Sequence, residues 1–242
     1  MTTADLRVCA LYPDVMNIYA DRGNLLMLAR RCAWRGIAMR VHAAGLGETL
    51  TGAGHHLYYL GGGQDADQRR CAADLVAHKR EGLARAAEAG AVVLGVCGGY
   101  QLLGHSYELA DSAIDGVGLL DVHTVRDPGP RLIGNVAIEL PDGRVLAGFE
   151  NHAGRTRLGA GQAPLGRVVR GHGNDGRSGD EGARTGNVIG TYLHGPLLPK
   201  NSWFCDWLIA TALGGGEAVE LAPLPDELEV AAHQSALRAA GL

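Results

Sequence analysis

The fold of this chain is decided by the stretch Ala91-Val92-Val93-Leu94-Gly95-Val96-Cys97-Gly98-Gly99-Tyr100-Gln101. An apolar run typical of a buried strand ends at one cysteine that has glycines on both sides. Glycine tolerates a strained turn that a Cβ atom disfavours, so the pattern predicts a nucleophile elbow with Cys97 at its tip. The residues from 100 to 104 are expected to begin a helix whose N–H groups favour the thiolate. A buried cysteine is more often a small packing residue, so the elbow alone leaves both interpretations open.

The segments around the elbow repeat a strand-then-helix order. Strands are expected at 6–12, 37–41, 56–60, 91–96 and 187–193, and helices at 23–35, 67–89, 201–213 and after residue 225. This alternation predicts the α/β class, with a doubly wound, mostly parallel sheet and flanking helices. Strand-like stretches at 118–125, 132–140 and 144–149 predict an antiparallel extension. The glycine-rich region 159–186 is expected to be a surface loop.

Composition excludes several classes of function. The 22 basic and 26 acidic residues give a net charge of −4, which offers no electrostatic case for nucleic acid or an anionic membrane as partner. The sequence shows no signal-peptide pattern and no apolar stretch long enough to span a membrane, so a cytoplasmic protein is expected.

The cysteines and histidines suggest neither disulfides nor a metal site. The five cysteines are Cys9, Cys32, Cys71, Cys97 and Cys205, an odd number with no C-x-x-C pair. Four of them are expected to be packing residues. The pair His55-His56 before a strand and His152, which is expected in a loop, have no cysteine or carboxylate nearby in ligand spacing, so no metal is predicted.

A thiol nucleophile needs a base and a polar cradle for the oxyanion that its attack creates. His194 ends a late strand and is the leading candidate base among ten histidines, although it could instead simply cap that strand. The run Gly61-Gly62-Gly63 follows another strand and is either a flexible turn or part of an oxyanion hole, in which Gly62 and Gly98 would donate N–H groups. Neither lysine follows a glycine, so this run is not a P-loop.

Five motifs in fixed order resemble a known family. Gly-Val-Cys-Gly-Gly-Tyr-Gln at 95–101, Gly-Gly-Gly-Gln-Asp at 61–65 and Gly-Thr-Tyr-Leu-His-Gly-Pro at 190–196 resemble class I glutamine amidotransferases of the cobyric-acid-synthase-like branch. The stretches 11–24 and 148–156 are similar to the glutaminase subunits of lipid II isoglutaminyl synthase, the GatD family. The resemblance runs from about Leu11 to Asn201. It implies that residues 1–242 form a single glutamine amidotransferase domain.

The resemblance also implies a reaction. Cys97 would attack the side-chain amide of L-glutamine, release ammonia and form a thioester that water hydrolyses to glutamate. Arg131 matches the family's glutamine-binding arginine, and a guanidinium fork suits an α-carboxylate. Many class I members carry an acid two residues after the histidine, but Pro196 stands there in this chain. The orienting acid would then be absent, distant in sequence or supplied by another subunit.

A partner is expected because ammonia released into water is largely protonated. By resemblance the partner is a MurT-like subunit of the Mur-ligase family, which amidates the α-carboxyl of D-glutamate in lipid II. No cofactor is expected in this chain, and ATP and Mg²⁺ are expected on the partner ligase. The interface is expected to be an apolar patch.

Three alternatives stay open at this point. A glutaminase for cobyrinic or cobyric acid amidation would generally share its chain with an ATPase domain, and this sequence shows no ATP-binding signature. A partner-free hydrolase of γ-glutamyl or other amides would not require free L-glutamine. A non-catalytic regulatory subunit of the same fold would not need Cys97, His194 and Arg131 intact.

Overall fold

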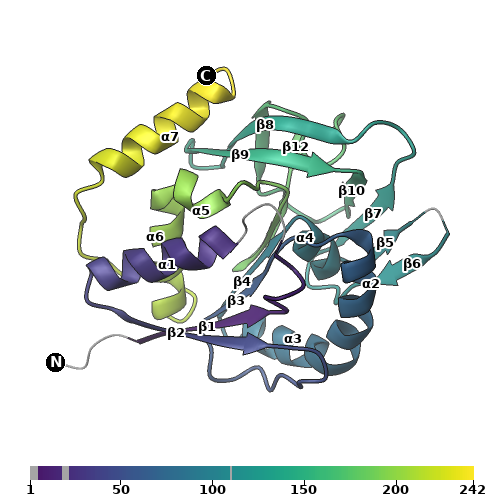
Figure 1. Cartoon of the computed structure of the whole chain (residues 1–242), viewed down its shortest axis with the longest axis horizontal. Coiled ribbons are helices and arrows are strands. Elements are labelled where there is room, and N and C mark those ends of the chain that lie inside the picture. The colour runs from purple at the N-terminus through teal and green to yellow at the C-terminus, as the bar shows by residue number, and fades with distance from the viewer. Residues whose placement is uncertain (1–4, 18–21, 110) are drawn as a thin grey trace.

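The computed structural model describes residues 5–17, 22–109 and 111–242. Residues 18–21, in the middle of the 11–24 motif, lie outside the described residues. The centre of the molecule is a six-stranded sheet with the order β13-β14-β4-β3-β1-β2 (Figure 1). Two further sheets of four strands each lie above the main sheet and to its right in Figure 1.

The main sheet is parallel except at one edge. Its parallel strands are β1 (Asp5–Leu11), β2 (Ala38–Ala44), β3 (Leu57–Leu60), β4 (Val92–Val96) and β14 (Val188–Thr191), and β13 (Ala183–Thr185) pairs antiparallel to β14. Every residue of β3 and β4 is buried, as expected for central strands covered on both faces. The predicted parallel sheet is confirmed.

Helices cover both faces of this sheet. Figure 1 shows α1 (Arg22–Trp34) and α6 (Ser202–Leu213) on one side and α3 (Arg80–Glu88) on the other. The helix expected at 67–89 is α2 (Asp65–Asp74) joined to α3 through a π-helical segment, Leu75–Lys79. The short helices α4 (Gly98–Leu103) and α5 (Leu197–Lys200) follow β4 and β14, and α7 (Glu227–Ala239) ends the chain. This arrangement is the doubly wound fold that the sequence predicted.

The expected antiparallel extension exists, but as two separate sheets, and one of them is mixed because β5 and β7 pair in parallel. One has the order β10-β7-β5-β6, with β5 (Ser106–Glu108), β6 (Ala113–Asp115), β7 (Val122–Arg126) and β10 (Gly154–Leu158). The other has the order β12-β11-β8-β9, with β8 (Leu132–Glu139), β9 (Val145–His152), β11 (Gly166–Arg170) and β12 (Asp180–Glu181). A two-way backbone pairing of Phe149 with His194 connects β9 to the end of the main sheet.

The region 159–186 is more ordered than its composition predicts. It contains β11, β12 and β13, and it buries Asn174 and Glu181 completely or nearly so. The Asn174 side chain donates to the Gly182 carbonyl and accepts from the Gly182 N–H, at 2.9 Å each. Polar side chains here satisfy backbone groups in place of a regular ladder, which hydrophobic periodicity does not detect.

Candidate active site

Cys97 lies in the strained turn that the sequence predicted. Its backbone has φ 51° and ψ −106°, and Tyr12 is the only other non-glycine residue with positive φ in the described part of the chain. The Cys97 N–H donates to the Thr191 carbonyl at 2.8 Å, which fixes the turn against β14. A Cβ atom at Gly99 would lie 2.1 Å from the Leu60 carbonyl oxygen, so the elbow needs glycine there. The strained turn predicted between the strand and the helix at Cys97 is confirmed.

The glycine run after β3 lies beside the elbow. A Cβ atom built on Gly98 would lie 3.0 Å from the backbone nitrogen of Gly63 and 2.8 Å from Gln68 Nε2. The Gln68 side chain donates to the Gly63 carbonyl at 3.1 Å and holds the end of the run in place. The loop with Gly62 and the start of α4 with Gly98 are therefore adjacent, as an oxyanion hole built from both would require.

A cavity of about 390 Å³ opens next to Cys97. This volume lies in the usual range of small-molecule sites, about 300–1,000 Å³. Arg131, just before β8, lines the same cavity, and its Nε and Nη2 donate to the side-chain and backbone oxygens of Asn151 at 2.7 and 2.8 Å. The lining residues are Gly63, Gln64, Asp65, Ala66, Gln68, Cys97, Gln101, Tyr107, Arg131, Asn151, His152 and Ala153.

His194 reaches the same end of the sheet from the neighbouring strand. Thr191 pairs with Val96 in the β14–β4 register, so Cys97 and His194 follow adjacent parallel strands by one and three residues. His194 is fully buried, and it is not among the described residues that line the cavity. Its backbone donates to and accepts from Phe149 at 2.8 and 3.1 Å, which ties its position to β9.

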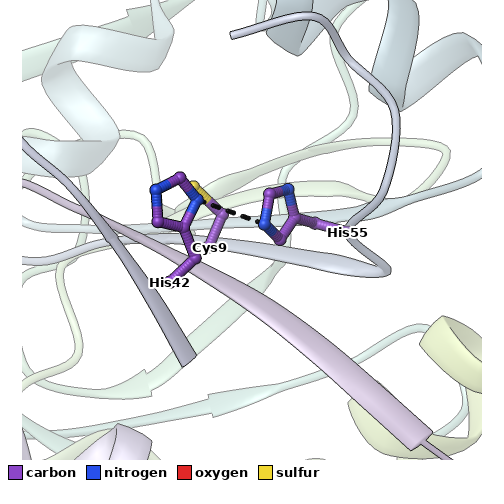
Figure 2. Close-up of side chains that lie close together, drawn as sticks. All are labelled: Cys9, His42 and His55. Atoms are coloured by element: carbon purple, nitrogen blue, oxygen red, sulfur yellow. Dashed lines mark hydrogen bonds between the residues drawn. The ribbon is translucent and has the colours of Figure 1, made fainter. Parts of the chain in front are cut away.

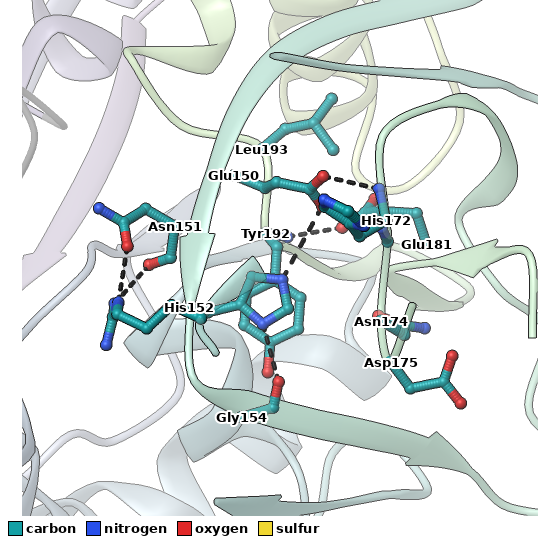
Figure 3. Close-up of polar contacts among 12 residues, drawn as sticks. Glu150, Asn151, His152, Gly154, His172, Asn174, Asp175, Glu181, Tyr192 and Leu193 are labelled. Atoms are coloured by element: carbon teal, nitrogen blue, oxygen red, sulfur yellow. Dashed lines mark hydrogen bonds and ion pairs between the residues drawn. The ribbon is translucent and has the colours of Figure 1, made fainter. Parts of the chain in front are cut away.

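His152 is the site residue that the sequence reasoning missed. It ends β9 instead of lying in a loop, it lines the cavity, and its ring stacks on Tyr192 with centroids 3.6 Å apart and planes 4° apart (Figure 3). Nδ1 donates to the Gly154 carbonyl at 2.8 Å, and Nε2 lies 3.9 Å from the Glu150 carboxylate. Burial, the largest influence, lowers the pKa of His152 although Glu150 raises it. The 148–156 motif contained His152, but no spacing rule gave it a role.

Two buried carboxylates stabilise the backbone behind the site. Glu150 accepts from the N–H groups of His172 and Gly173 at 2.6 and 2.9 Å (Figure 3). Glu181 accepts from the Tyr192 N–H at 2.6 Å and from the Thr191 hydroxyl at 3.0 Å. Burial raises the pKa of Glu181 to about 8, against the opposing influence of these hydrogen bonds. Glu181 thus supports the segment that leads to His194, and Glu150 supports the turn at His172 and Gly173.

The other four cysteines differ from Cys97 in their surroundings. All five cysteines are buried, but only Cys97 faces the cavity; burial raises the pKa of Cys9 to about 12 and of Cys32 and Cys71 to about 11. Burial also raises the pKa of Cys205. A thiol with so high a pKa stays protonated near neutral pH and is a poor nucleophile. None of the four lines the cavity among the described residues.

The arrangement suits attack on a carbonyl of a small zwitterion. The thiol lies on a strained elbow beside backbone N–H groups, and Arg131 offers a cation for a carboxylate. Asp65 is the only acidic residue among the described residues that line the cavity, where it accepts from Arg126 at 2.6 Å. No helix in the described ranges is both long enough and apolar enough to cross a membrane.

Comparison with known proteins agrees with this chemistry. Residues 7–202 match the CobB/CobQ-like glutamine amidotransferase domain. The chain is 39% identical to the GatD subunit of the glutamine-hydrolysing lipid II isoglutaminyl synthase of Streptococcus pneumoniae, over 86% of this chain and 80% of that protein. It is 36% identical to the Staphylococcus aureus GatD subunit, over 95% and 94% of the two chains.

More distant similarities extend to a second group of sequences and to a solved structure. A cobyric acid synthase of Methylobacterium nodulans is 42% identical, but over 61% of this chain and 31% of that protein. The structure of PurLQS from Thermotoga maritima matches with a TM-score of 0.57 at 20% identity, over 86% of this chain and 95% of that one. The structural similarity supports the fold.

Proposed function

Because this chain belongs to the CobB/CobQ-like glutamine amidotransferases, and among them to the GatD subunits of lipid II isoglutaminyl synthase, we propose that it hydrolyses L-glutamine for lipid II amidation. The observation that carries the proposal is the strained Cys97 turn facing a cavity that also contains Arg131. A non-catalytic regulatory subunit would have no use for a strained backbone, which costs of order 1–3 kcal/mol.

The reaction begins with proton transfer from the Cys97 thiol to His194. The thiolate attacks the side-chain amide carbon of glutamine, and the N–H groups of Gly62 and Gly98 stabilise the oxyanion. Collapse of this intermediate breaks the C–N bond, and ammonia leaves with the proton from His194. Water, deprotonated by His194, then cleaves the thioester to release glutamate and restore the thiol.

Recognition of the free amino acid uses both charges of the cavity. Arg131 is held in place by Asn151 and presents its guanidinium to the α-carboxylate of glutamine. Asp65, whose Oδ2 pairs with Arg126, offers its other carboxylate oxygen to the α-ammonium group. A site with both groups selects a free amino acid over a peptide-bound glutamine, whose backbone nitrogen and carbonyl are uncharged.

The ammonia passes to a MurT-like ligase of the Mur-ligase family, which holds ATP and Mg²⁺ and converts the α-carboxyl of D-glutamate in lipid II to an amide. Both subunits act in the cytoplasm, where lipid II precursors are modified. Pro196 occupies the position at which many class I members carry the orienting acid, so the ligase is proposed to supply that acid in trans. The cobyric acid synthases share a smaller part of this chain than the GatD subunits do, which favours lipid II as acceptor.

The deciding experiment measures glutamate release from L-glutamine with and without the candidate ligase, with Cys97→Ala as control. Turnover that requires Cys97 and rises with the ligase is the expected result. Absence of Cys97-dependent turnover in both conditions would reject catalysis and favour the regulatory role. Substitution of candidate acids on the ligase should abolish turnover while the complex stays intact, and unchanged turnover would exclude the acid in trans.

A further inference from the structure

Three side chains of the kinds that bind metal ions, one cysteine and two histidines, meet at the β1–β2 side of the main sheet. Cys9 lies in β1, His42 in β2, and His55 in the segment that enters β3 (Figure 2). One ligand atom from each residue lies within 4.8 Å of the other two. None of the three is among the described residues that line the Cys97 cavity. The cluster is therefore separate from the proposed reaction.

The register of the sheet creates this cluster. Cys9 pairs with His42 on one side and with Tyr58 on the other, in parallel register. The His55 ring packs edge-on against Tyr58 with centroids 5.6 Å apart and stacks on His42 with centroids 5.1 Å apart. Cys9 and His42 are 33 positions apart in the sequence, and His42 and His55 are 13 apart. Strand pairing thus brings all three side by side.

The spacing of the two imidazoles fits tetrahedral zinc. His42 Nδ1 and His55 Nε2 are 3.2 Å apart and share a hydrogen bond (Figure 2), which a bound ion would replace. Two nitrogens bound to one tetrahedral Zn²⁺ at about 2.0–2.1 Å lie about 3.3–3.4 Å from each other. A thiolate and two imidazoles bind Zn²⁺ in preference to Mg²⁺ or Ca²⁺, because those two ions select oxygen ligands.

A carboxylate already orients one of the imidazoles. His42 Nε2 lies 2.7 Å from Glu48 Oε1, so it donates to that carboxylate and leaves Nδ1 as the nitrogen with the lone pair. A metal-bound histidine characteristically donates its second N–H to a carboxylate in this way. The side chain of His42 is 42% exposed, which gives an ion a path from solvent to the otherwise buried thiol.

We propose that Cys9 Sγ, His42 Nδ1 and His55 Nε2 bind one Zn²⁺ ion, with water as the fourth ligand and Glu48 orienting His42. On binding, the Cys9 thiol loses its proton to solvent, and the proton on His55 Nε2 moves to Nδ1. The ion would join β1, β2 and the entry to β3 and thereby stabilise this edge of the sheet.

The test is a titration of the full chain with Zn²⁺ alone in competition with a chromophoric chelator, and with Co²⁺ as a spectroscopic substitute. The wild-type chain is expected to bind one equivalent and to show the near-ultraviolet thiolate-to-Co²⁺ charge-transfer band. Cys9→Ser should lose the band, and His42→Ala should weaken Zn²⁺ binding at least tenfold. Glu48→Gln should weaken it by about tenfold because it removes an outer-shell carboxylate.

Two control variants separate this site from other ligands in the chain. Cys97→Ser removes the active-site thiol and should keep both the band and the stoichiometry. His123→Ala removes one member of an exposed His105, Asp121 and His123 cluster and should also change neither. Loss of the band in Cys97→Ser, or unchanged Zn²⁺ affinity in His42→Ala, would overturn the proposal. Because the side chain of His42 is exposed, His42→Ala should fold, and that variant decides the question if Cys9→Ser does not fold.

Discussion

Two cysteines of the same parallel sheet, Cys97 and Cys9, have opposite environments. Cys97 follows the end of β4 with a strained backbone and faces a cavity, whereas Cys9 lies within β1 in extended conformation. Burial raises the pKa of Cys9 to about 12 and keeps its thiol protonated in the absence of a metal. Two histidines lie beside Cys9, and the polar groups of an amino-acid site lie beside Cys97.

The difference shows that the end of a parallel strand, more than the residue type, determines what a thiol can do. At the strand end, backbone N–H groups and side chains from several loops converge on one point. Within a strand, the same side chain meets only its neighbours on one face of the sheet. A ligand can therefore collect around Cys97, while Cys9 is restricted to whatever the register places beside it.

The largest effect should separate the two thiols in function. Cys97→Ala should lower ligase-stimulated glutaminase activity by about 10³-fold or more, because no other thiol can form the thioester. Cys32→Ala, at a buried cysteine outside both sites, should change activity less than threefold. Glutamate release is the measurement. Residual activity above 10% in Cys97→Ala would contradict the assignment of the nucleophile.

The elbow should be less tolerant of added volume than an open turn. Gly99→Ala should reduce the free energy of unfolding by about 3 kcal/mol, because the new Cβ meets the Leu60 carbonyl at 2.1 Å. Gly45→Ala is the matched control, since nothing lies within 4 Å of its Cβ position, and should change stability by less than about 0.5 kcal/mol. Urea unfolding measures both. Equal effects would show that the elbow is not tightly packed.

The buried Glu181 carboxyl behind β14 should make the free energy of unfolding depend on pH. The folded pKa of Glu181, about 8, exceeds the usual carboxyl value, so the folded state keeps a proton that the unfolded state loses. This contribution is complete below about pH 4.5 and is lost progressively as pH rises from there through 8.

From pH 5.5 to 8.5 the wild-type chain should therefore lose about 3 kcal/mol more unfolding free energy than Glu181→Gln. Urea midpoints at the two pH values measure the difference. The exposed Glu220→Gln should behave like the wild-type chain. A wild-type pH dependence that Glu181→Gln leaves unchanged would show that this carboxyl does not titrate as stated.

Binding of glutamine in the cavity beside Cys97 should depend on the shape of the Arg131 guanidinium as well as on its charge. Arg131→Lys keeps the charge but loses the fork that binds a carboxylate, so the KM for glutamine should rise about tenfold with a smaller change in kcat. Steady-state kinetics with the ligase present measure both constants. A fall in kcat with unchanged KM would instead assign Arg131 to the transition state.

The smallest effect tests the backbone contrast directly. Cys97→Gly should be more stable than Cys97→Ala by about 1 kcal/mol, because glycine relieves the strain at φ 51°. At Cys9, in an extended strand, the order should reverse and glycine should be less stable than alanine by about 1 kcal/mol. Urea unfolding of the four variants measures both differences, and the same sign at both positions would refute the contrast.

Local patterns predicted the elements well because strand and helix periodicity is written in neighbouring residues. The strands expected at 91–96 and 56–60 are β4 and β3, and the single helix expected at 67–89 is α2, the π-helical segment and α3. The 159–186 region was the main miss, since Asn174 and Glu181 order it through side-chain contacts with backbone groups. The extension also divided into two sheets, which depends on long-range pairing.

By itself the sequence determined the elbow, because the turn at Cys97 requires glycines at adjacent positions and an apolar strand before them. Only the tertiary structure brought Arg131, Asn151 and His152 to the same cavity, because antiparallel pairing places the start of β8 beside the end of β9. It alone joined Cys9, His42 and His55, because strand register is a property of pairing between distant segments. Chemistry encoded within a few residues can be read from sequence, and chemistry built across strands requires the fold.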